Sequence, residues 1–120
     1  MFRYALYASV GAVIGSLGRY EVGLAIPHNS TTDFPWATFS VNVLGALIIG
    51  VLSQRDRVMT NDGLRHFCVT GVLGGFTTFS ALAVETIQLS SRPIVCVVYV
   101  LATFGVGLAA TSFGRKVTSQ

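Results

Sequence analysis

The chain has 120 residues, of which 52% are hydrophobic and 11% charged, with a formal net charge of +3 and a mean hydropathy of +0.66. A soluble domain carries about 25% charged residues, so this composition excludes an ordinary soluble fold. We expect one membrane domain over residues 1–120 whose basic residues lie in loops and at the ends. Basic residues in such places act as signals of membrane topology, and nucleic-acid binding is therefore a poor explanation of the positive charge.

Four apolar segments separated by short polar connections indicate an all-α membrane protein of four transmembrane helices. The predicted spans cover about residues 4–26, 36–53, 67–84 and 94–113. Such a small bundle has little interior of its own, although three of its spans carry polar stripes. Those stripes need a partner surface, so we expect an oligomer, most simply a dimer.

The first span contains Gly11 and Gly15, a GxxxG pair that is typical of closely packed membrane helices. Arg19 and Glu21 lie near its far end, where long charged side chains can reach the interface and anchor the helix. Pro27 closes the span.

The second span begins at Trp36, an expected interfacial anchor. Thr38, Asn42 and Gly45 follow at spacings that place them on one helical face. An unpaired amide inside a membrane costs a few kcal/mol, so Asn42 must face protein or water. Two interpretations stay open: a polar contact between helices, and the lining of a pore.

The third span contains three glycines, two threonines and a serine within residues 71–80. Each glycine costs ~1 kcal/mol relative to alanine in a helix, so this stretch predicts a helix that is broken at mid-membrane. Broken helices are where channels and transporters place ion sites. Small residues also allow close helix packing, which is the alternative interpretation. The span ends near Glu85.

The fourth span follows Arg92 and Pro93. Its polar and small residues are spaced by four and form a stripe: Tyr99, Thr103, Gly107 and Thr111. Cys68 and Cys96 lie in apolar runs without the spacing of a metal site, so we expect free thiols.

The sequence contains no catalytic motif and no pair of carboxylates within a span, so we expect no enzyme. Passage of a small ion remains, and the residue types favour an anion. Phenyl rings have a positive edge that Phe76 and Phe79 can offer to an anion, whereas a cation pathway would show rings of Asp or Glu. The side chains that can donate hydrogen bonds are Thr38, Asn42, Thr77, Thr78, Ser80, Tyr99 and Thr103.

Three blocks of this sequence resemble the signature blocks of the CrcB/Fluc fluoride channels. They are GAVIGSLGRY at residues 11–20, TFSVNVLG at 38–45 and GVLGGFTTFS at 71–80. The resemblance covers the membrane portion in order and spacing, and GGFTTFS is highly specific. It implies passive fluoride export that relieves fluoride toxicity, through two four-helix subunits that assemble antiparallel in the cell (inner or plasma) membrane.

The resemblance also implies functional residues. A structural Na⁺, which is not transported, would be held at the dimer centre by the backbone carbonyls of Gly74 and Thr77. Asn42 and Phe79 would line the pore, and Ser80, Tyr99 and Thr103 would form a polar track. Thr38 and Phe76 are further pore candidates from their chemistry, and Arg19 and Glu85 are candidates for a vestibule or for anchoring.

One departure from the family pattern leaves alternatives open. The family often has a second phenylalanine where this chain has Leu82, and leucine offers no ring edge to an anion. A non-conducting or half-active partner subunit is therefore an alternative function. A small multidrug transporter is another, but it needs a carboxylate within the first span, and Glu21 lies near the end of that span.

The basic residues predict a fixed orientation. With four spans, six of them lie on one side of the membrane, and the other side has Arg92, with Arg19 ambiguous. The positive-inside rule then places both termini in the cytoplasm. An antiparallel dimer would form with a second copy or with a homologue of inverted charge bias. The six residues are Arg3, Arg55, Arg57, Arg65, Arg115 and Lys116.

Overall fold

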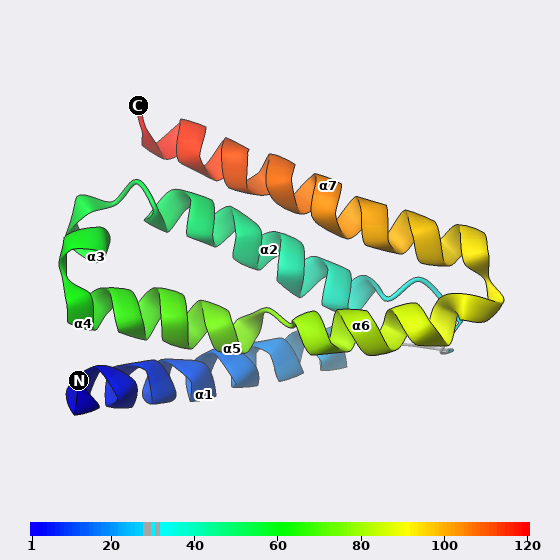
Figure 1. Cartoon of the computed structure of the whole chain (residues 1–120), viewed down its shortest axis with the longest axis horizontal. Helices are drawn as coiled ribbons and strands as arrows, with labels where there is room; N and C mark the ends of the chain where they lie inside the picture. Colours follow the sequence, from blue (N-terminus) through cyan, green and yellow to red (C-terminus); the bar gives the residue numbers. More distant parts are fainter. Residues whose placement is uncertain (28–29, 31) are drawn as a thin grey trace.

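The computed structural model describes residues 1–27, 30 and 32–120, and this part of the chain is helical without strands. Part of the predicted loop after the first span, at positions 28, 29 and 31, lies outside the described residues. Figure 1 shows long helical rods lying side by side. In chain order the elements are α1 (Phe2–Ala25), α2 (Trp36–Leu52), α3 (Asp56–Thr60), α4 (Asp62–Arg65), the π-helix η1 (His66–Leu73), α5 (Gly74–Phe76), α6 (Phe79–Gln88), the 3₁₀ turn η2 (Leu89–Ser91) and α7 (Pro93–Thr118).

The rods pack mainly in two pairs. α1 runs along η1 and α5, and α2 runs along α7. The two termini lie at the same end of the molecule as α3 and α4, whereas the connection from α6 to α7 lies at the opposite end (Figure 1). The basic residues that the sequence assigns to one side therefore belong to elements that gather at one end of the bundle.

The polar stretch 54–66, which we expected to be a loop, is partly helical. Asp56 and Asp62 lie in the first turns of α3 and α4, where a negative carboxylate interacts favourably with the helix dipole. The side chain of Asn61 caps α4 by accepting a hydrogen bond from the Leu64 N–H at 2.9 Å. Because α4 continues directly into η1, this rod begins at residue 62 and not near residue 67.

By length and apolar composition, two helices in the described part of the chain are long enough to cross a membrane. They are Asp62–Ser91, taken across its break, and Pro93–Thr118, while Trp36–Leu52 is apolar but shorter. α1 does not reach this hydropathy because charged, small and polar residues are mixed into it. The count of four spans therefore stays a prediction.

Glycines bring the paired helices into backbone contact. A Cβ atom added to Gly11 would lie 2.9 Å from the Val72 nitrogen, and one added to Gly75 would lie 3.0 Å from the Ala12 Cα. The same holds between α2 and α7, where a Cβ on Gly114 would lie 2.6 Å from the Leu47 carbonyl oxygen. The close packing predicted from the GxxxG pair is confirmed, and it places α1 directly behind the glycine-rich stretch.

This packing predicts opposite effects at two glycines of α1. A Cβ on Gly15 would lie 2.8 Å from the Phe76 nitrogen, whereas one on Gly23 would meet nothing within 4 Å. Gly15→Ala should lower the free energy of unfolding by about 1–3 kcal/mol through overpacking. Gly23→Ala should leave it unchanged or raise it, because alanine favours the helix. Unfolding of both purified variants in detergent measures the difference, and equal stability of the two would contradict the contact.

Candidate functional site

The glycine-rich helix is interrupted at Thr77 and Thr78, which we call the helix break. α5 ends at Phe76, and both threonines are extended, with φ/ψ of −80°/156° for Thr77 and −146°/115° for Thr78. The Thr78 hydroxyl oxygen then caps α6 by accepting a hydrogen bond from the Ala81 N–H at 3.1 Å. The broken helix expected from residues 71–80 is thus present, although the interruption follows the glycines.

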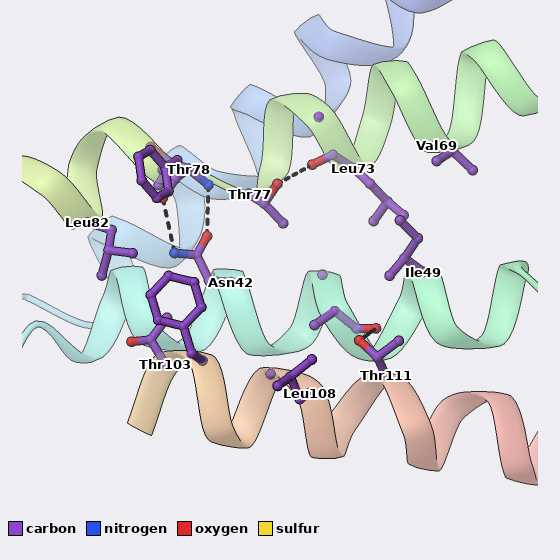
Figure 2. A pocket seen from close by; sticks show the side chains of 16 residues that line it. Asn42, Ile49, Val69, Leu73, Thr77, Thr78, Leu82, Thr103, Leu108 and Thr111 are labelled. Carbon is purple, nitrogen blue, oxygen red and sulfur yellow. Dashed lines mark hydrogen bonds between the residues drawn. The ribbon is translucent and has the colours of Figure 1, made fainter. Parts of the chain in front are cut away.

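Asn42 holds the helix break from the neighbouring helix α2. Its Nδ2 donates to the Thr78 carbonyl at 3.0 Å, and its Oδ1 accepts from the Thr78 N–H at 2.8 Å. Figure 2 shows the amide facing the backbone with both bonds drawn. An asparagine amide has two N–H donors, so one remains for another acceptor. Of the two interpretations of Asn42, the polar contact between helices is therefore present. The remaining N–H leaves a role in lining a pore open as well.

The helix break leaves main-chain carbonyls without their helical partners. The N–H of Thr78 would reach the Gly74 carbonyl in a continuous helix, but it donates to Asn42. The N–H of Ala81 would reach the Thr77 carbonyl, but it donates to the Thr78 side chain. In the part of the chain that the structure describes, neither carbonyl accepts another hydrogen bond. Unwound carbonyls of this kind are ligands for Na⁺ in membrane proteins.

Arg19 satisfies a third carbonyl at this place. Its Nε donates to the Gly75 carbonyl at 3.1 Å, and the Ser16 hydroxyl approaches the same oxygen at 3.5 Å. The side chain is half-buried. Arg19 thus turns toward the last turn of α5, although its position in the sequence suggested the end of a span.

Glu85 lies between two hydroxyl groups that the sequence placed along the pore. The Thr38 hydroxyl donates to Oε1 at 2.7 Å, and the Tyr99 hydroxyl donates to Oε2 at 2.6 Å. Tyr99 is fully buried and packs against Leu82 and other apolar side chains. Because both carboxylate oxygens receive donors, this group is a polar core that joins α2, α6 and α7.

Most of the hydroxyl donors predicted from the sequence are committed inside the subunit. The Thr77 hydroxyl donates to the Leu73 carbonyl at 2.8 Å, and the Thr103 hydroxyl donates to the Tyr99 carbonyl at 2.7 Å. The Ser80 hydroxyl lies 3.3 Å from that of Thr78. The structure therefore separates the candidates into two groups, one around Glu85 and one around the helix break.

The three apolar candidates have different surroundings. The Phe79 side chain is 74% exposed, so its ring edge is free to meet a partner or an ion. The Phe76 ring lies between Gly18 and Gly45, within 3.5 and 3.8 Å of Cβ atoms added at those positions. Leu82, at 5% exposure, belongs to the apolar core beside Tyr99.

A cavity of about 500 Å³, which we call the central cavity, opens between α2, the broken helix and α7. Figure 2 shows Asn42, Thr77 and Thr78 on one part of its wall and Thr103 on another. Thr38, Phe76, Ser80, Tyr99, Arg19 and Glu85 do not line it. Its lining residues are Asn42, Gly45, Ala46, Ile49, Val69, Leu73, Gly74, Thr77, Thr78, Phe79, Leu82, Thr103, Phe104, Gly107, Leu108 and Thr111.

Phe104 is a lining residue that the sequence analysis missed. It directly follows Thr103 on α7 and, like Phe79, contributes a phenyl ring to the lining of the central cavity. The stripe of residues spaced by four contains Thr103, so proximity to that stripe is the signal that could have found Phe104. Gly107 and Thr111 of the same stripe also line the cavity.

Comparison with known proteins gives consistent matches along the chain. Residues 6–115 match the family described as CrcB-like protein, Camphor Resistance (CrcB). A protein of Rhizobium leguminosarum bv. trifolii is 40% identical over 94% of this chain and 94% of its own length. Proteins of Agrobacterium fabrum (40% identity, 95% and 94%) and Helicobacter pylori (40%, 91% and 88%) are similar. All three relatives are named fluoride-specific ion channel FluC. The chain belongs to the CrcB family.

Proposed function

We propose that this protein is the subunit of a fluoride-specific ion channel that lets fluoride leave the cell passively. One observation carries the proposal: the central cavity presents the Asn42 amide and the Phe79 ring beside a helix break held by Asn42 itself. The relatives named as fluoride channels support it. The protein is then a channel and not an enzyme.

The residues of the central cavity can replace part of the hydration shell of a small anion. The second N–H of Asn42 is a donor, and the edges of the Phe79 and Phe104 rings are electropositive. Few donors are free here, because Thr77 and Thr103 already donate their hydroxyl protons to backbone carbonyls, and the hydroxyl groups of Thr78 and Ser80 share one hydrogen bond. Conduction needs binding that is favourable enough for entry and weak enough for exit, which such a sparse set of donors provides.

A structural Na⁺ fits the helix break. The carbonyls of Gly74 and Thr77 are free of protein donors and both residues line the central cavity, whereas Phe76 does not line it and Gly75 is bound by Arg19. These two carbonyls would hold the ion. When bound, it would supply a fixed positive charge beside the path of the anion. The Arg19 guanidinium adds a second positive charge behind the same turn.

The subunit is expected to have four spans and to work as an antiparallel dimer. The polar groups of the central cavity are open on one side, and in a membrane unpaired polar groups must be covered by protein or water. The Phe79 side chain, 74% exposed, also needs a partner to become part of an enclosed path. A second copy of the chain would supply both, and the antiparallel arrangement follows from the resemblance of the signature blocks.

A half-active or non-conducting partner subunit is the second candidate. Leu82 stands where the family often has phenylalanine, and it is buried in the core beside Tyr99. In this arrangement an oppositely oriented homologue would complete the dimer. The family membership leaves no ground for the multidrug-transporter alternative, and Glu21 is exposed near the end of α1.

The unequal distribution of basic residues between the two ends bears on the choice between a homodimer and a pair of oppositely oriented homologues. Arg19 turns into the bundle to bind Gly75, so it does not count as a loop charge. The count is then six basic residues at one end of the bundle against Arg92 at the other. The Arg92 side chain donates a hydrogen bond to the Thr32 carbonyl there. We propose a fixed orientation with both termini in the cytoplasm.

The first test measures selectivity and the role of Asn42. Proteoliposomes loaded with fluoride or chloride, with the potential clamped by an ionophore, should release fluoride alone. Asn42→Asp should lower fluoride efflux more than tenfold, or by over ~1.4 kcal/mol in the barrier, because a carboxylate has no N–H for Thr78 or for the anion. Asn61→Asp, the same change at a helix cap outside the cavity, should conduct normally. Equal release of chloride would refute the proposed function.

The second test concerns Na⁺. Dialysis against a salt of N-methylglucamine on both sides should abolish fluoride efflux and lower the melting temperature of the protein in detergent, because the Gly74 and Thr77 carbonyls then have neither a protein donor nor a cation. Returning Na⁺ should restore both. Unchanged efflux and melting temperature after complete exchange would show that the site is wrong or dispensable, while leaving the fluoride channel itself untouched.

The third test determines orientation. In a chain with Cys68 and Cys96 replaced by Ala, Thr60→Cys should react with a membrane-impermeant thiol reagent only from the cytoplasm. Ser91→Cys should react only from the outside. Both positions are exposed and lie at opposite ends of the bundle. Comparable labelling of each site from both faces would indicate dual insertion and would favour a homodimer over a pair of oppositely oriented homologues.

A further inference from the structure

A second cavity, which we call the basic cavity, lies at the end of the bundle where α7 finishes. It has a volume of about 330 Å³ and is lined only by polar and cationic residues, with no carboxylate among them. The lining residues are Gln54, Ser112, Arg115, Lys116 and Ser119. Nothing in the proposed path of fluoride uses it.

The basic cavity is built on closely packed helices. Three of its residues occur on α7 at positions 112, 115 and 116, spacings that put them on one helical face, and Ser119 caps the end of that helix. Gln54 follows the end of α2. Just before the cavity, α2 and α7 are in backbone contact at Gly50 and Gly114, and the Thr111 hydroxyl donates to the Ala46 carbonyl at 3.0 Å. These contacts fix the backbones of the two helices from which the lining side chains project.

The two cations of the basic cavity have no anionic partner in the protein. Within the described ranges, the ion pair that forms joins Arg65 and Asp62 at 2.8 Å, and no carboxylate lies within bonding distance of Arg115 or Lys116. Both stand in the last turn of α7, where the helix end offers about half a negative charge. That partial charge does not neutralise two full positive charges, so the cavity attracts an anion.

The position of the basic cavity indicates which anion. It lies where the apolar run of α7 ends, and the end of an apolar run is where a membrane helix reaches the head-group region. Apolar side chains next to it on α7 are turned outward, with Phe113 63% and Val117 56% exposed. Acyl chains can cover such side chains, whereas a free phosphate ion cannot. Basic pockets between membrane helices on the cytoplasmic side bind anionic head groups.

We propose that the basic cavity binds the phosphate of an anionic phospholipid, with Arg115 and Lys116 contacting the phosphate oxygens. Ser112 and Gln54 provide further hydrogen-bond donors. The Ser119 hydroxyl donates to the Lys116 carbonyl at 3.0 Å, so it does not contribute a free donor. The residues that act as topology signals then have a second role in fixing lipid at the joint of α2 and α7.

The test uses the full-length protein purified in detergent, where membrane orientation has no influence. Binding of dioctanoyl-phosphatidylglycerol, measured by native mass spectrometry, should weaken about thirty-fold in Arg115→Gln/Lys116→Gln, which corresponds to about 1 kcal/mol for each cation. Arg55→Gln/Arg57→Gln removes the same charge at the same end but lies outside the cavity. That control should bind the lipid as the wild type does.

Three results would overturn the proposal. Equal loss in both double variants would indicate diffuse attraction by the basic end. Wild-type affinity for dioctanoyl-phosphatidylcholine as high as for phosphatidylglycerol would remove the need for a net anionic lipid. Binding of inorganic phosphate as tight as that of phosphatidylglycerol would assign the cavity to a free ion. Normal fluoride efflux by the Arg115→Gln/Lys116→Gln protein shows that it is folded, and Ser112→Leu, which fills the cavity without changing charge, should weaken lipid binding as well.

Discussion

The side-chain amide of Asn42 makes two hydrogen bonds with the backbone of Thr78, and the shape of the broken helix depends on this pair. In a continuous helix the Thr78 N–H would bind the Gly74 carbonyl. Because Asn42 takes over that N–H and also supplies a donor to the Thr78 carbonyl, the chain can leave the helix without stranding these groups in an apolar medium. The exchange frees the Gly74 carbonyl at the wall of the central cavity.

Most of the remaining polar groups form hydrogen bonds with one another inside the subunit, so few can contact an ion. Arg19 binds the Gly75 carbonyl from behind, and Glu85 receives the hydroxyl groups of Thr38 and Tyr99. Buried polar networks of this kind rigidify a core when every member is satisfied. The central cavity is therefore left with an amide N–H and two phenyl rings, which can meet a small anion, and with two carbonyls, which can meet only a cation.

The two ends of the bundle differ in charge, and the difference has a structural basis. At one end lie α3, α4 and both termini (Figure 1), and six basic residues belong to these segments or flank them. There the last turn of α7 packs against the end of α2 through Gly50 and Gly114, which leaves Arg115 and Lys116 facing one cavity. At the other end Arg92 binds a loop carbonyl. By the two proposals above, the same residues would affect insertion through their number and lipid binding through their position.

The sequence by itself determined the helical class, the break near residues 71–80 and the close packing at Gly11 and Gly15, because composition, glycine content and spacing act locally. Its signature blocks also identified the family. The tertiary structure decided which side chains meet. Only packing could bring Glu85 between Thr38 and Tyr99, turn Arg19 toward Gly75 and place Phe104 in the central cavity, since each contact joins residues far apart in the chain. Helix ends also moved, since the capping by Asn61 extends the third rod into a stretch that hydropathy alone marked as a loop.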